Sequence, residues 1–210
     1  MVAKEHKMDN RTVTYLERSE KITGYRVKIN RKPAFQVIGY TIIIPPKTET
    51  QMIPRFVEEL MADGRLDTLK KTSPVPVWIL GLGSWDEECQ PGGMRYTMCI
   101  EETEQTNLSC LLEQYPLHRQ SFEACEWMCF EVPQERFDTD LFWKDDPYKM
   151  LRLLDYRFHL RVGVHFDAIP PDHDEKNNPG MEFWISVQKQ DETCDVCSVR
   201  EECGNILPFR

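Results

Sequence analysis

Short segments in which hydrophobic and polar residues alternate recur along the chain, and this alternation is typical of β-strands with one buried face. In the first half, residues 25–29 alternate in this way, and residues 35–44, 77–82 and 96–100 form further short segments with a strand-like composition. They are rich in β-branched and aromatic residues, and the second segment ends at a Pro-Pro pair that cannot continue a strand. We therefore expect four strands in this half.

A helix is predicted between the second and third of these strands. Hydrophobic residues recur there at the three- and four-residue spacing of one helix face: Ile53, Phe56, Val57, Leu60 and Met61. The helix should begin near residues 48–50 and end at Gly64, since glycine commonly terminates helices. The first half thus has the order strand, strand, helix, strand, strand.

The second half repeats this order. When Tyr25 is aligned with Tyr115, residues of similar type coincide without gaps over the first two strands. A helix beginning at Pro147 follows, and then strands at residues 162–169 and 181–187. The buried stripe of this helix should consist of Met150, Leu151, Leu154 and Phe158. The duplication predicts an α+β fold built from two similar units, each an antiparallel sheet with its helix on one face.

We divide the chain into an extension at residues 1–24, one domain at residues 25–190 and a cysteine-containing tail at residues 191–210. Within the domain, the two repeats cover residues 25–103 and 115–190. If the repeats associate about a pseudo-twofold axis, their uncovered sheet faces form a central groove with the helices outside. Such a groove is a common place for a ligand.

The last predicted strand carries the strongest candidate for a site. Phe183, Ile185 and Val187 share one face, which is a core face. Glu182 and Trp184 share the other, so that a carboxylate lies beside an indole. Two interpretations of this second face remain open. It is exposed to solvent, or it lines the groove and binds a cationic or hydrogen-bonding ligand.

The composition is that of a soluble folded protein, with 40% hydrophobic and 29% charged residues. The net charge of −9 argues against direct binding to nucleic acid, whose phosphates require clustered lysine and arginine. No apolar run approaches the ~20 residues of a membrane span, and the first residues lack the apolar segment of a signal peptide. We therefore expect a cytoplasmic protein without a membrane partner, whose eight cysteines are reduced.

The tail contains one Cys-x2-Cys step, which is a spacing that metal ligands use. A structural zinc site needs four ligands, however, and only three cysteines are local: Cys194, Cys197 and Cys203. We therefore predict a tail of reduced thiols without a bound metal. Motifs for nucleotide phosphates, serine hydrolases and zinc proteases are missing from the sequence, and no cofactor is predicted.

Residues 25–190 resemble the GyrI-like small-molecule-binding family, also described as the effector-binding domain of AraC- and MerR-type regulators. The resemblance rests on five segments, at residues 25–29, 33–40, 53–61, 126–130 and 181–187. The last is the most specific, because closing strands of the form Glu-x-Trp/Tyr-Ile-Pro-Val/Ile are common in the family. Ser186 stands where a proline is usual, and this departure does not touch the acid.

The resemblance implies a duplicated strand–helix–strand–strand (SHS2-like) fold with a central groove. It also implies multidrug-type ligands, namely lipophilic aromatic cations that stack on groove aromatics while Glu182 contacts the charge. The candidate aromatic residues are Trp127, Trp184, Tyr96, Trp143 and Tyr148, and for the last two a core or rim position is the better interpretation. The DNA-binding domain of the regulators is missing here. We therefore expect a stand-alone module for sensing, sequestration or detoxification, with a separate regulatory protein as a further partner.

A hydrolase is the alternative function. Some stand-alone members of the family hydrolyse strained, cyclopropanoid-type electrophiles, and a desolvated glutamate is suited to general acid or base chemistry. Tyr96, in the corresponding strand of the first half, is the candidate catalytic partner of Glu182. If Tyr96 faces the helix instead, capture without turnover is the better interpretation. A third hypothesis is a protein partner, such as a nucleic-acid enzyme that this chain inhibits.

Overall fold

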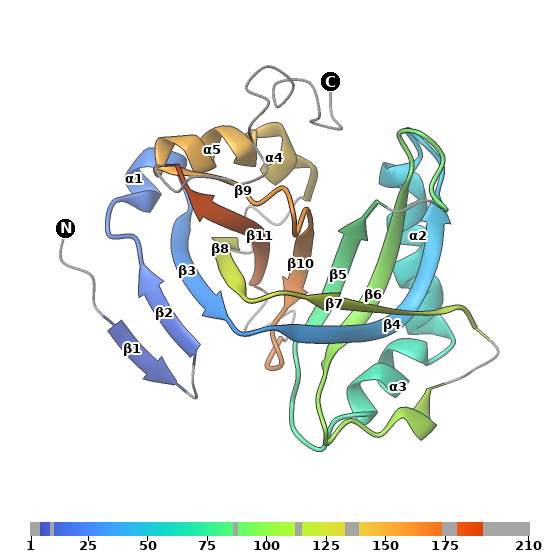
Figure 1. Cartoon of the computed structure of the whole chain (residues 1–210). Coiled ribbons are helices and arrows are strands. Elements are labelled where there is room, and N and C mark those ends of the chain that lie inside the picture. The colour runs from blue at the N-terminus through green and yellow to red at the C-terminus, as the bar shows by residue number, and fades with distance from the viewer. Residues whose placement is uncertain are drawn as a thin grey trace.

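The computed structural model describes residues 5–8, 11–85, 88–111, 115–132, 139–173 and 180–190. These residues form one antiparallel sheet with packed helices, which confirms the predicted α+β class (Figure 1). Ten of their strands lie in the order β1-β2-β3-β8-β11-β10-β5-β6-β4-β7, and β9 pairs with β11. The strands are β1 (Glu5–Met8), β2 (Arg11–Tyr15), β3 (Arg26–Lys32), β4 (Phe35–Ile44), β5 (Ile79–Ser84), β6 (Met94–Glu102), β7 (Leu117–Phe122), β8 (Cys125–Val132), β9 (Tyr156–Phe158), β10 (His165–Ile169) and β11 (Met181–Lys189).

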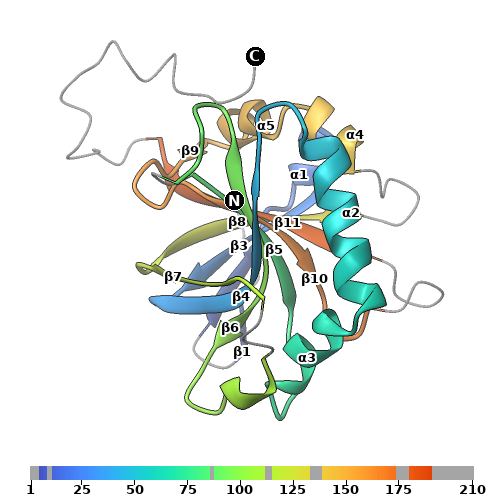
Figure 2. The same ribbon diagram turned by 90° about the vertical axis from the view of Figure 1, so that its right-hand side faces the viewer.

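Helices cover one face of this sheet, which we call the helix face (Figure 2). The helices are α1 (Ser19–Thr23), α2 (Glu49–Ala62), α3 (Arg65–Lys71), α4 (Thr139–Lys144) and α5 (Pro147–Leu153), and one 3-10 turn spans Leu108–Cys110. Two hydrophobic clusters hold them in place: α2 and α3 pack on β4, β5 and β6, whereas α4 and α5 pack on β3, β8 and β11. None of the helices in the described ranges has the length and apolar character needed to cross a bilayer.

The two halves exchange their first strands. β3 opens the first repeat but pairs with β8 of the second, and β7 opens the second repeat but pairs with β4 of the first. Corresponding cross-strand rows therefore occur in both halves, namely Lys28, Cys129 and Trp184 in one and His118, Gly39 and Cys99 in the other. After this exchange, the sheet consists of two halves that are joined where β10 pairs with β5, and there Asp167 is opposite Gly81.

Most of the predicted elements are confirmed. The strand expected at residues 35–44 coincides with β4, and Pro147 is the first residue of α5. Phe183, Ile185 and Val187 are each at most 2% exposed, as expected for a core face. Their burial follows from the alternation of the sequence, since every second side chain of β11 points to the helix face.

The helical segment after β4 differs from the prediction in two respects. Met61 is 56% exposed, because the side of α2 that packs on the sheet is centred on Phe56 and Leu60. The short helix α3 has no counterpart in the sequence prediction. It begins directly after Gly64, whose positive φ of 80° turns the chain between two helices.

Two further segments differ. Phe158 lies in β9 and not in the stripe of α5, because α5 ends at Leu153 and Asp155 then adopts a left-handed φ of 66°. At the N-terminus, β2 of the expected extension pairs with β3, and β1 pairs with β2. The extension therefore continues the sheet beyond the first repeat.

Candidate functional site

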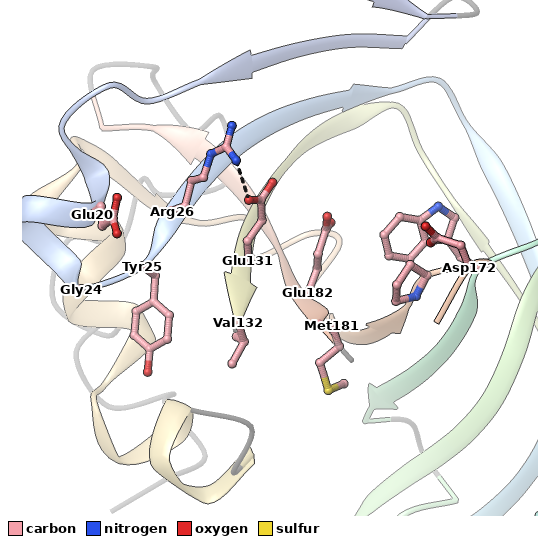
Figure 3. Close-up of a pocket in the computed structure, with 12 residues that line it drawn as sticks. Glu20, Gly24, Tyr25, Arg26, Glu131, Val132, Asp172, Met181 and Glu182 are labelled. Atoms are coloured by element: carbon pink, nitrogen blue, oxygen red, sulfur yellow. Dashed lines mark ion pairs between the residues drawn. The ribbon is translucent and has the colours of Figure 1, made fainter. Parts of the chain in front are cut away.

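The face of the sheet opposite the helix face, which we call the groove face, carries a row of charged residues across β3, β8 and β11. Arg26 is opposite Glu131, and Glu131 is opposite Glu182. These three side chains point to one side of the sheet, whereas Tyr25 and Met181 point to the other (Figure 3). The row lines one side of a pocket of about 510 Å³ at this end of the strands, which we call the Glu182 pocket, and Tyr25, Val132 and Met181 line the pocket from the other side.

Glu182 is buried, with 8% of the residue exposed, and both oxygens of its carboxylate have partners. Oε1 forms an ion pair with the Lys28 ammonium. Oε2 accepts a hydrogen bond of 2.6 Å from the indole N–H of Trp184. These contacts compensate the cost of removing a carboxylate from water. Of the two interpretations of this strand face, exposure to solvent is therefore wrong.

Lys28 links two carboxylates. Its Nζ pairs with Glu182, lies 3.5 Å from Glu131 Oε1 and is 6.0 Å from the centroid of the Tyr15 ring. Burial opposes protonation, but the charge and the hydrogen bond of Glu182 outweigh burial and raise the pKa of Lys28. Glu131 also accepts a hydrogen bond of 3.0 Å from the Tyr15 hydroxyl and pairs with Arg26 at 3.5 Å.

An aromatic cluster adjoins the charged row. The ring centroids of Trp184 and Trp78 are 5.2 Å apart. The Lys32 ammonium lies 5.2 Å from the Trp184 centroid and 4.0 Å from that of Phe35, and it pairs with Glu101 at 2.7 Å. A second pocket of about 520 Å³ borders Trp184 and Glu101. Trp78 lines both pockets.

Trp127 also lies on the groove face, but it is fully buried between other rings. Its centroid is 5.0 Å from that of Phe166, 5.8 Å from Phe35 and 6.0 Å from Phe122. Its Nε1 has no hydrogen-bond partner within the described ranges. Trp127 thus packs against the rings of the aromatic cluster and does not line either pocket.

Tyr96 does not lie with Glu182. The residue that corresponds to Glu182 in the first half is Thr97, because Thr97 is opposite Thr41 as Glu182 is opposite Glu131. Tyr96 is one position earlier and belongs to the helix-face cluster with α2 and α3. Adjacent residues of a strand face opposite sides, so the catalytic pair predicted from the sequence is not formed.

Trp143 and Tyr148 also lie on the helix face. Trp143, in α4, packs 4.6 Å from the His165 ring and 6.0 Å from Phe183. Tyr148, in α5, packs 5.4 Å from Phe158, and burial raises its pKa to about 12. Both residues fill space between helices and sheet, as the core interpretation expected, and neither reaches the Glu182 pocket.

The sequence interpretation missed Lys28, Glu131 and Trp78. One signal was present, since the polar residues Arg26, Lys28 and Asn30 alternate with the apolar residues Val27 and Ile29 in β3. This pattern indicates a polar strand face, but it does not identify the carboxylates that face it. Lys28 and Glu182 are 154 positions apart in the chain, and only the strand exchange brings them together.

No cluster of three or more histidine, cysteine, aspartate or glutamate side chains suited to a metal ion occurs in the part of the chain that the structure describes. The three cysteines of the tail, Cys194, Cys197 and Cys203, lie outside the described residues. The prediction of a metal-free tail therefore stays a prediction.

No protein-family model matches this sequence, and no curated protein matches it. Solved structures do match the fold. The SAV2435 protein bound to tetraphenylphosphonium has a TM-score of 0.57 at 14% identity, over 77% of this chain and 93% of that chain. A proposed transcription regulation protein from Staphylococcus aureus MU50 has a TM-score of 0.56 at 14% identity, over 79% and 99%. An integron cassette protein from Vibrio cholerae has a TM-score of 0.50 at 13% identity, over 77% and 95%. At these identities, the similarity establishes a shared fold.

Proposed function

We propose that this chain is a GyrI-like protein that binds a lipophilic aromatic cation in the Glu182 pocket. The observation that carries the proposal is a buried carboxylate at the wall of a pocket that also has an aromatic wall. The charged residues that line this pocket are four acids and one base, namely Glu20, Glu131, Asp172, Glu182 and Arg26. Lys28 pairs with Glu182 and Glu131, and the acids still outnumber the two bases, so the potential favours a positive ligand. Trp78 offers a ring for stacking or a cation–π contact.

Two further observations support the proposal. The volume of about 510 Å³ lies within the range of small-molecule sites. Glu182 and Trp184 share the groove face of the closing strand, where the indole donates a hydrogen bond to the carboxylate. The shared fold with a protein that was solved with tetraphenylphosphonium makes this cation a suitable probe.

Replacing Glu182 with glutamine tests the proposal. The change removes one negative charge and leaves the Lys28 ammonium to repel a cation. Loss of a charged partner from a desolvated site costs on the order of 2–5 kcal/mol, which corresponds to roughly 30-fold or more in affinity. We expect calorimetry to show a loss of this size for tetraphenylphosphonium, and little change for triphenylphosphine oxide, a neutral aromatic of related shape.

The matched control is Glu126→Gln. Glu126 lies on the neighbouring strand β8, pairs with Arg31 at 2.6 Å and alternates to the opposite face, so its loss changes the net charge equally without touching the pocket. It should leave both affinities unchanged. Equal losses for the cation and the neutral compound in Glu182→Gln would show that Glu182 is not the charge contact. No binding of either compound to the wild type would refute the proposal.

Capture without turnover is the form of this function that the geometry supports. The hydrolase alternative requires a second group that stabilises a leaving atom near Glu182. Its candidate, Tyr96, faces the helix side, where its hydroxyl donates a hydrogen bond of 3.2 Å to Asp167 Oδ2. We therefore propose binding, in a sensing or sequestering role, and no catalytic step.

A further inference from the structure

The carboxylate that the proposed ligand would contact is already matched by a cation of the protein itself. Lys28 pairs with Glu182 Oε1, and Trp184 donates a hydrogen bond to Oε2. The two partners of the ion pair are both largely shielded from water, with 15% of the Lys28 side chain and 11% of the Glu182 side chain exposed. A ligand's cation therefore meets a carboxylate whose charge is compensated.

The surroundings of the Lys28 ammonium are those expected for the charge of an aromatic cation. The ammonium lies between two carboxylates, Glu182 and Glu131, and 6.0 Å from the ring centroid of Tyr15. Lysine is suited to such a role because its charge is carried on a flexible four-carbon stem. The network of Arg26, Lys28, Glu131 and Glu182 contains two cations and two anions, so it is neutral as long as Lys28 stays in place.

We propose that Lys28 is an internal competitor for the ligand's cation: its ammonium occupies the cation position on Glu182 and must leave that carboxylate before a ligand's charge can replace it. Lys28 then sets both the affinity for cations and the discrimination between cationic and neutral ligands. The inference rests on the proposed function of the Glu182 pocket. It adds a specificity-determining residue that the family resemblance did not indicate.

The strand exchange explains why a lysine of the first repeat can pair with Glu182 of the second repeat. β3 pairs with β8 of the second half, so that Lys28 is opposite Cys129, and Cys129 in turn is opposite Trp184 of β11. In the corresponding row of the first half, His118, Gly39 and Cys99 take these places. The charged site with its own counter-cation is therefore built in one half of the pseudo-symmetric domain.

The decisive variant is Lys28→Met, which keeps an unbranched side chain and removes the charge. We expect it to bind tetraphenylphosphonium at least about 10-fold more tightly than the wild type in calorimetry. The affinity for triphenylphosphine oxide should change less than about twofold. The gain should disappear in the double variant Lys28→Met with Glu182→Gln. Lys28→Arg, which keeps the charge, should not show the gain.

A matched control is Arg31→Met, which removes one positive charge from the opposite face of the same strand. Arg31 pairs with Glu126 and does not line the Glu182 pocket, so its loss should leave both affinities unchanged. A gain in Arg31→Met equal to that in Lys28→Met would mean that overall charge, and not the Lys28 ammonium, controls binding. That result would overturn the inference.

A measurement on the wild type covers the case in which Lys28→Met does not fold. Nuclear magnetic resonance of the lysine ammonium groups should show Lys28 protected from hydrogen exchange in the free protein, because it is buried and ion-paired. Saturation with tetraphenylphosphonium should release it, so that its exchange becomes fast. An ammonium that stays protected in the complex would overturn the inference.

These outcomes separate the inference from the proposed function. If the wild type binds tetraphenylphosphonium and Glu182→Gln does not, while Lys28→Met binds no more tightly, the proposed function stands and the inference is wrong. If neither the wild type nor a folded Lys28→Met variant binds, both are wrong. Binding by the wild type that becomes tighter in Lys28→Met and is lost with Glu182→Gln supports both.

Discussion

Replacing Gly39 with alanine should lower the free energy of unfolding by about 3 kcal/mol or more. Gly39 lies in the middle of β4, where a Cβ atom would overlap the Met98 carbonyl oxygen and lie 2.5 Å from Cys99 Cα. Backbone atoms of a paired central strand cannot move aside without breaking the ladder between β4 and β6. Urea denaturation monitored by circular dichroism measures the loss.

The second half provides the control for this substitution. Cys129 occupies the place in β8 that Gly39 occupies in β4, and Cys129→Ala keeps the Cβ atom and removes only the sulfur. It should cost about 1 kcal/mol, as expected for a small truncation of a buried side chain. A loss below about 1 kcal/mol in Gly39→Ala would contradict the prediction, because it would show that β6 shifts freely.

Replacing Asp167 with asparagine should stabilise the protein at alkaline pH. Burial raises the pKa of Asp167 to about 7, which the hydrogen bond from Tyr96 offsets only in part. One oxygen, Oδ1, has no hydrogen-bond partner among the described residues. As the pH rises from about 4 to about 7, the unfolded chain loses this proton while the folded protein retains it, so stability falls. The asparagine amide does not ionise in this pH range, so the variant does not lose stability in this way.

The difference between the variant and the wild type should therefore be smallest near pH 4 and should level off above pH 7. A pKa displaced from 3.8 to about 7 corresponds to about 4 kcal/mol at most. Urea denaturation at a series of pH values measures it. The wild-type curve alone is not sufficient, because burial lowers the pKa of His165 to about 4 and so removes stability as the pH falls below about 6.5. A difference that does not change with pH would contradict the assignment to Asp167.

Much of the fold could be predicted from the sequence because it depends on local periodicity. The twofold repeat of side chains along a strand placed Phe183 and Ile185 in the core and Glu182 and Trp184 together on the other face. The same parity could have placed Tyr96, since it shares a strand face with the apolar residues Met98 and Ile100, which pack under the helices. Tyr96 was misplaced because the strands of the two repeats were matched without their residue-by-residue register, which makes Thr97 the counterpart of Glu182.

Tertiary structure alone decided what Glu182 faces. The constant offset between the repeats revealed a duplication, but it does not specify whether β3 pairs within its own repeat or with the other one. Both arrangements satisfy the same alternation, because hydrogen bonds between strands join any two compatible edges. The pairing of β3 with β8 brings Lys28 to Glu182 across 154 positions of the chain. The acid and its neighbouring indole were thus determined by sequence spacing, whereas its counter-cation was determined by the order of the strands.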